Sequence, residues 1–276
     1  MIRYVYDNEE YVFNPARQKA HMALKKSLSE LCGKDGVTEI AFKRQWLKNM
    51  ESLGGIFADG WYCPPPLGIA VLFGDRVTFD SLRNEYNWSN DTVMDWNRDM
   101  FYAYASPVDK ETGTIGDTSV TIYFGENRKI LDHIKNCHDA VMDVFENLEK
   151  VSKGRELFRM SQEIFEKHGL KSDVISRTDN MPVNLGHTFP SLDGASEKES
   201  LSDEDKLIIS KARKFVNDTG EWEFTDGLQF TVEPQLLSLE DPEMPQITQH
   251  YVVMANRDGF TVCNDIDEIL KAYGQI

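Results

Sequence analysis

The stretch DGLQFTVEPQL, residues 226–236, carries the pattern on which the fold assignment rests. An Asp-Gly turn precedes a run of Phe, Thr and Val that is typical of a β-strand, and a Glu-Pro pair ends the run. Two other stretches also combine strand and turn signals with one polar group: TIGDTSVTIYFG (residues 114–125) and MPVNLGHTFP (residues 181–190). Taken together and in this order, they make Asp117, His187 and Glu233 candidate site residues.

Four amphipathic helices are predicted in the sequence before and between these stretches. Apolar residues recur at intervals of three and four, between cap residues and glycines, over residues 14–33, 38–55, 126–151 and 155–169. Strand-like runs rich in β-branched residues follow each helix pair, at residues 67–73, 228–232 and 250–255. The repeated order of helix pair and strands predicts two similar halves around one sheet.

A polar, acidic segment at about residues 191–221 interrupts this pattern. It contains one short predicted helix, at about residues 203–216, and we interpret it as a surface insertion. Neither half of the chain has enough strand-like sequence to form its own sheet and bury its helix faces. We therefore expect one domain over residues 1–276.

The charge balance argues against several classes of partner. Lys and Arg number 30 against 46 Asp and Glu, and a net charge of -16 repels a phosphate backbone and an anionic membrane surface. No apolar run approaches the roughly 18 residues of a spanning helix. The first residues do not resemble a signal peptide, and the four cysteines form no CxxC pair. We expect a soluble, cytoplasmic protein with reduced thiols and no nucleic-acid or membrane partner.

In their order and spacing the three stretches resemble the ligand-bearing strands of the pita-bread family, which includes methionine aminopeptidases, proline-specific peptidases and creatinase. The later run QHYVVMANRDGFTV, residues 249–262, resembles the last strand of that family. The resemblance covers about residues 14–270. It implies an α/β fold in which a pseudosymmetric, curved antiparallel sheet is covered by helices, and it implies that the three candidate side chains converge in one pocket.

The resemblance also implies a metal site that has lost part of its ligand set. The family uses two aspartates, one histidine and two glutamates, because two adjacent dications need bridging carboxylates to offset their repulsion. Asp117, His187 and Glu233 stand at ligand positions. Ser106 stands at the first aspartate and Gln249 at the last glutamate. We therefore expect at most one divalent metal, iron, manganese or zinc.

Other candidate residues follow from the same comparison. A shifted alignment would offer Asp109 as the first aspartate. The histidines that family peptidases use for proton transfer are missing, and His250 is a candidate replacement by its position in sequence. Trp61 and Tyr62, in the aromatic and proline-rich segment of residues 59–66, are candidates for a substrate pocket. A packed connection between helix and strand is the alternative for that segment.

Three functions remain open from the sequence. The chain is a single-metal hydrolase, or a metal-free enzyme that cleaves a carbon–nitrogen bond as creatinase does, or a catalytically inactive module that binds peptide or protein partners. The retained Asp, His and Glu favour an enzyme, whereas the two neutral ligand positions argue against a general aminopeptidase. We expect a small-molecule or short-peptide substrate and leave a homodimer open.

Overall fold

The structure is a computed structural model that describes residues 1–5, 13–172 and 179–276. The chain divides into two units. We call residues 7–126 with 190–212 the N-terminal unit, and residues 1–6 and 127–189 with 213–276 the C-terminal unit. Among the described residues, no helix combines the length and apolar composition that crossing a membrane requires.

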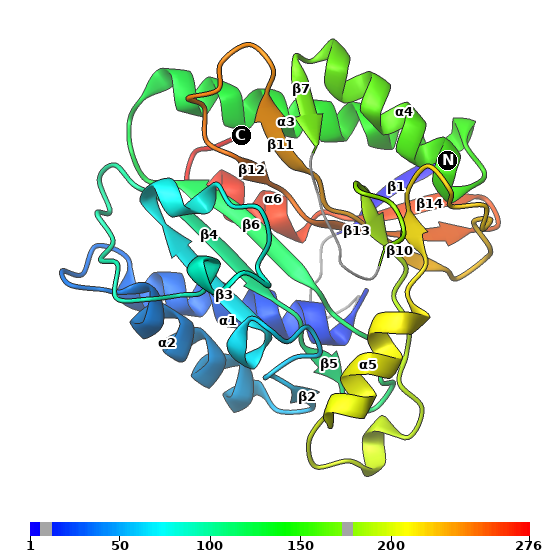
Figure 1. Cartoon of the computed structure of the whole chain (residues 1–276), viewed down its shortest axis with the longest axis horizontal. Coiled ribbons are helices and arrows are strands. Elements are labelled where there is room, and N and C mark those ends of the chain that lie inside the picture. Colours follow the sequence, from blue (N-terminus) through cyan, green and yellow to red (C-terminus); the bar gives the residue numbers. More distant parts are fainter. Residues whose placement is uncertain (6–12, 173–178) are drawn as a thin grey trace. The chain divides into compact units, whose positions relative to one another are not determined.

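In the N-terminal unit, two helices, α1 (Pro15–Leu31) and α2 (Glu39–Leu53), pack against each other. An antiparallel sheet has the order β3 (Ile69–Phe73), β4 (Met100–Ala105) and β6 (Thr118–Tyr123), with β4 in the middle. Every residue of these three strands is buried. The helices lie along this sheet (Figure 1). The unit also contains β2 (Ile56–Phe57) paired with β5 (Val108–Asp109), and α5 (Asp203–Ala212).

The C-terminal unit has its own helix pair, α3 (Arg128–Glu146) and α4 (Gly154–Lys167). One sheet has the order β1 (Ile2–Val5), β14 (Gly259–Cys263), β13 (Tyr251–Asn256) and β10 (Gln229–Val232), and only its β1–β14 pair is parallel. A second sheet has the order β12 (Ile247–Thr248), β11 (Gln235–Ser238) and β7 (Leu170–Ser172). The unit is completed by β8 (Gly186–His187) paired with β9 (Phe215–Val216), and by α6 (Asp265–Ala272).

The two units repeat one order of elements. In each, a helix pair is followed by three antiparallel strands whose second member along the chain is the middle strand, as in β3–β4–β6 and β7–β11–β12. The repetition that the sequence predicts is therefore present in the order of the elements.

The four predicted helices are present, with ends that the capping residues explain. Asn14 and Thr38 accept hydrogen bonds from the backbone N–H groups of Arg17 and Ala41, as N-cap side chains do. Gly54 ends α2 with a φ of 65°, a left-handed conformation that favours glycine.

The helix predicted over residues 203–216 is shorter, because α5 ends at Ala212. The backbone after it pairs with the strand that carries His187: the Thr188 N–H donates to the Lys214 carbonyl, and Phe215 lies opposite His187. Tertiary strand pairing outweighs the local helical pattern at these residues.

Glu39 is the buried polar centre of the N-terminal unit. Its side chain has no exposed surface, and its carboxylate accepts hydrogen bonds from the backbone N–H groups of Phe73 and Asn90 and from Arg76 Nε, at 2.8 to 2.9 Å. Burial raises the pKa of Glu39, and these donors oppose that rise. One side chain thus joins α2 to the end of β3 and to the loop at Asn90.

We expect Glu39→Gln to lower the free energy of unfolding by about 3–5 kcal/mol, because breaking a buried ion pair leaves Arg76 and two N–H groups poorly matched. Urea denaturation measures the change. Glu51→Gln, at an exposed position of the same helix, is the matched control and should stay within about 0.5 kcal/mol of wild type. A loss below about 1 kcal/mol for Glu39→Gln would contradict this role.

Candidate functional site

Glu233 lies in a break between β10 and β11. Pro234 follows it and has no N–H to donate, which is why the ladder is interrupted here. The strand pairs on the two sides of the break keep one register: Val232 lies opposite Tyr251, and Gln235 opposite Thr248. Continuing that register through the break places Glu233 opposite His250 and Pro234 opposite Gln249.

His187 reaches the same strand from β8. Its backbone N–H donates to Thr231 Oγ1 at 2.9 Å, and the next residue, Thr188, forms an isolated antiparallel β-bridge with Phe230. Gly186 allows this close approach, because a Cβ there would lie 2.3 Å from the Thr231 carbonyl oxygen. A glycine before the histidine is therefore required by the packing of β8 on β10.

The carboxylate of Glu233 lies between two imidazoles. His187 Nε2 is 3.6 Å from Glu233 Oε1, and His250 Nδ1 is 3.3 Å from Glu233 Oε2. The side chains of His187 and His250 are 4% and 0% exposed, whereas that of Glu233 is 16% exposed. We call these three residues the Glu233 cluster. Only its carboxylate has appreciable access to a bound molecule.

The orientation of His187 is fixed from outside the cluster. His187 Nδ1 lies 3.0 Å from the Thr188 carbonyl oxygen. Because a carbonyl only accepts, Nδ1 carries a proton and donates it, and Nε2 is the nitrogen that faces Glu233. The arrangement suits proton transfer between an imidazole and a carboxylate.

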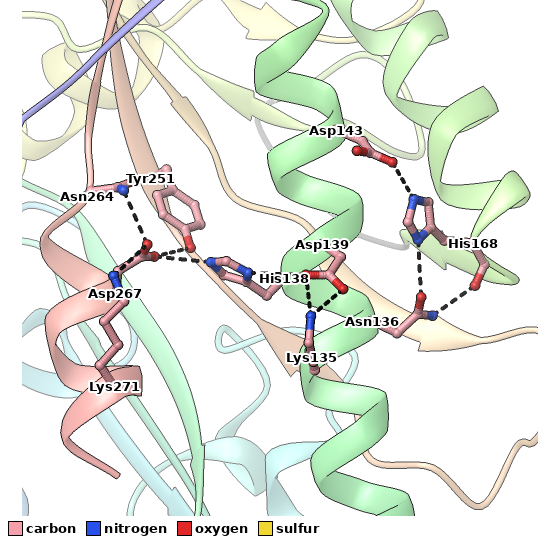
Figure 2. A network of polar contacts seen from close by, with 10 residues as sticks. All are labelled: Lys135, Asn136, His138, Asp139, Asp143, His168, Tyr251, Asn264, Asp267 and Lys271. Atoms are coloured by element: carbon pink, nitrogen blue, oxygen red, sulfur yellow. Dashed lines mark hydrogen bonds and ion pairs between the residues drawn. The ribbon is translucent and has the colours of Figure 1, made fainter. Parts of the chain in front are cut away.

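The strand that carries His250 is anchored on its helix side. Figure 2 shows Asp267 of α6 accepting from the Tyr251 hydroxyl at 2.8 Å and from Asn264 Nδ2 at 3.2 Å, with His138 Nε2 of α3 at 3.3 Å. Phe145 of α3 packs edge-on against the Tyr251 ring. Tyr251 follows His250 directly, so these contacts hold the backbone on which His250 stands.

Gln249 supplies a neutral amide where the resemblance implies a glutamate. Its side chain is fully buried, and within the described part of the chain neither Nε2 nor Oε1 has a hydrogen-bond partner. Buried amides are normally paired, so this position is polar, uncharged and unmatched by the surrounding protein.

In the N-terminal unit, Asp117 is held by protein donors. Trp61 Nε1 donates to Asp117 Oδ1 at 2.6 Å, and the buried Arg17 donates through Nη1 to the Asp117 backbone carbonyl. Asp117 and Trp61 are 1% and 2% exposed. Trp61 thus positions the carboxylate of Asp117, while the neighbouring Tyr62 is only half-buried.

Ser106 directly follows β4 and packs against the connection between α2 and β3. Its hydroxyl accepts from the Tyr62 N–H and donates to the Gly68 carbonyl, both at 3.1 Å. A Cβ on Gly60 or Gly68 would lie 2.5 or 2.6 Å from Ser106 Oγ. The hydroxyl therefore occupies a space between two glycines, which a longer carboxylate would overfill.

Asp109 organises its own turn. Its Oδ1 accepts from the N–H groups of Glu111 and Thr112 and from Thr112 Oγ1, at 2.8 to 3.1 Å. This Asx-type arrangement accounts for an aspartate at this position without a ligand role.

No protein-family model and no curated protein matches the chain. Solved structures do match it over 90% or more of its length. They include an X-Pro aminopeptidase from Thermotoga maritima (16% identity, TM-score 0.59), the prolidase from Pyrococcus horikoshii (15%, 0.61) and a methionine aminopeptidase from Rickettsia prowazekii (15%, 0.61). The chain has the pita-bread fold.

The fold predicted from the three sequence stretches is thereby confirmed. The chain spans 58% of the X-Pro aminopeptidase, 62% of the prolidase and 93% of the methionine aminopeptidase. At these identities the similarity shows the pita-bread fold, and it leaves substrate and activity to be argued from the residues.

The side chains that the structure brings together do not fit the metal centre that the pita-bread fold implies. Over residues 1–5, 13–172 and 179–276, no three His, Cys, Asp or Glu side chains are grouped to hold a metal ion. Asp117 accepts from an indole, and Glu233 faces two imidazoles. The predicted convergence of Asp117 with His187 and Glu233 involves both units and remains a prediction.

Lys43 of α2 is a buried cation beside the aromatic and proline-rich segment. Its amine donates to the Pro66 carbonyl and the side chain is 8% exposed. Burial lowers the pKa of Lys43 from 10.5 to about 8, and the nearby Cys63 partly offsets this.

Replacing Ser106 by aspartate should destabilise the protein without creating a metal site. We expect Ser106→Asp to lower the free energy of unfolding by about 1–3 kcal/mol through overpacking, and Ser106→Ala to cost about 1 kcal/mol through lost hydrogen bonds. Urea denaturation compares the variants, and calorimetric titration with Mn²⁺ tests for metal. A stable Ser106→Asp protein that binds Mn²⁺ would show that the position can hold a ligand.

The stability of the protein should depend on pH through Lys43. The folded-state pKa lies below the unfolded-state value, so folding carries a penalty for the charged amine below about pH 8 that disappears as pH rises towards 10.5. Wild type should therefore gain unfolding free energy relative to Lys43→Met over this window. Lys48→Met, exposed on the same helix, is the control. A Lys43→Met difference that is constant with pH would refute the effect.

Proposed function

We propose that this chain is a divergent hydrolase on the aminopeptidase and creatinase scaffold. It binds at most one divalent metal, and it cleaves a carbon–nitrogen bond in a small molecule or short peptide through the Glu233 cluster. The observation that carries the proposal is the carboxylate of Glu233 between two buried imidazoles, at 3.6 and 3.3 Å.

The roles follow from access and hydrogen bonding. Glu233 is the least buried member of the cluster, so its carboxylate accepts a proton from a water molecule as the water oxygen attacks the substrate carbon. Glu233 then returns this proton to the nitrogen as the carbon–nitrogen bond breaks, while the facing nitrogens of His250 and His187 hold its carboxylate in position. The Thr188 carbonyl fixes the ring of His187 for this role, as orienting groups do for catalytic imidazoles.

We do not expect this chain to be a general aminopeptidase. Ser106 and Gln249 are neutral at positions where the resemblance implies carboxylates, and Asp117 is engaged with Trp61. A second dication would lack the charge that offsets its desolvation. A hydroxide held between two metals is therefore not part of the chemistry.

A binding module for peptide or protein partners is the second candidate. It is favoured by Asp117 and Ser106, whose polar groups are matched by protein donors and acceptors, as in a site retained for structure. The net charge of -16 suits a basic peptide. A cytoplasmic location and a homodimer are compatible with both candidates and remain proposals.

Assays of methionyl and prolyl peptides with added Co²⁺, Mn²⁺ or Zn²⁺ should give turnover well below about 1 per second, the low end of the ordinary enzyme range. Any activity found on small amides should survive chelation with EDTA. Glu233→Gln should reduce that activity by about 10²- to 10⁴-fold, the usual contribution of a general base. Glu243→Gln, exposed in the same unit, should leave it unchanged.

Fast metal-dependent cleavage of either peptide type would overturn the proposal. Hydrolysis of small amides that is indifferent to Glu233→Gln would exclude the cluster as its source. Absence of hydrolysis, together with saturable binding of a basic peptide, would instead favour the binding module.

A further inference from the structure

We infer that Arg83, held against Tyr62, is a recognition site for a carboxylate group. The inference goes beyond the proposed function and does not depend on it. The binding itself is argued from the N-terminal unit alone.

Arg83 is an arginine without an acidic partner among the residues that the structure describes. Its guanidinium carbon lies 4.4 Å from the centroid of the Tyr62 ring, and its buried Nε has no hydrogen-bond partner. Within the described part of the chain, the guanidinium makes neither an ion pair nor a hydrogen bond. The protein has 46 acidic and 30 basic residues. A guanidinium group that pairs with none of the described acidic residues is available to bind the anionic group of a ligand.

The neighbouring Arg76 shows what a structural arginine does in this protein. Its guanidinium donates to Glu39 and to the backbone carbonyls of Tyr86 and Trp88. Arg83, in contrast, lies over an aromatic face, and its guanidinium donors have no acceptor among the described residues.

The Tyr62 ring is fixed on several sides. It packs edge-on against Trp61 and Tyr104, with centroids 5.5 and 5.7 Å away, and the Tyr62 N–H donates to Ser106. Stacking on a fixed ring sets the plane of the guanidinium. The Arg83 donors are therefore preoriented, which reduces the entropy lost when they bind a ligand.

A series of contacts through Tyr62 and Trp61 links Arg83 to Asp117. The guanidinium stacks on Tyr62, Tyr62 contacts Trp61, and Trp61 donates to Asp117 Oδ1 at 2.6 Å. All four residues belong to the N-terminal unit. The Arg83 guanidinium thus lies in the same part of this unit as the aspartate singled out by the sequence.

A carboxylate fits this site better than a phosphate does. Two parallel N–H groups of one guanidinium match the two oxygens of a carboxylate. A phosphate dianion would be better served by a second free cation, and the buried amine of Lys43 is directed at the Pro66 carbonyl. The expected ligand is a short peptide or an acylated amino acid with a free carboxylate.

The test compares alanylalanine with alanylalanine amide by calorimetric titration of the whole chain. The free carboxylate should bind at least about tenfold more tightly than the amide, a difference of about 1.4 kcal/mol. Arg83→Gln should abolish this preference, Arg83→Lys should retain part of it, and Tyr62→Leu should weaken it while keeping the charge. Circular dichroism checks that each variant is folded.

Arg98→Gln is the matched control, because Arg98 is 77% exposed and pairs with Asp95 and Asp99 in the same unit; the preference should persist in it. A preference that survives Arg83→Gln, equal binding of the two dipeptides, or no binding at millimolar concentration would overturn the inference. Tighter binding of inorganic phosphate would overturn the choice of carboxylate. Glu233→Gln separates the two proposals, since it should stop turnover and leave the carboxylate preference intact.

Discussion

The candidate site depends on one constraint, the antiparallel pairing of residues 229–236 with residues 247–254 in a single register. Pro234 interrupts the hydrogen bonds but not the alignment, so Glu233 stays opposite His250. A slip by one residue would turn Glu233 to the other face of the sheet and separate it from both imidazoles. The contacts of Tyr251 with Asp267 and Phe145 hold this register from the helix side.

Much of the fold could be predicted because its signals are local. Asn14 and Thr38 mark helix starts that the structure reproduces, and the order of three short stretches was sufficient for the pita-bread assignment. The end of α5 could not be predicted in this way. Residues 213–216 continue a helical pattern in sequence, yet they pair with the His187 strand, a partner that local spacing does not reveal.

The sequence offers candidate residues for the site but not their hydrogen-bond partners. The order and spacing of three stretches made His187 and Glu233 candidates, position in sequence suggested His250, and the roles of all three remain predictions. No pattern shows that Trp61 donates to Asp117 across 56 residues, or that Ser106 fills a space between Gly60 and Gly68. Arg83 gave no sequence signal at all, because the lack of a partner becomes visible only when its neighbours are placed.

In the described part of the chain, the backbone passes between the two units at residues 126–127, 189–190 and 212–213. Gly113 and Thr114 hydrogen-bond with Leu192 and Ser191, which are synthesised almost eighty residues later. Domains generally fold as units as they leave the ribosome. Here the N-terminal unit cannot be completed until about half of the C-terminal unit has been translated, so the nascent protein must carry an unfinished β5–β6 connection while residues 127–189 are synthesised.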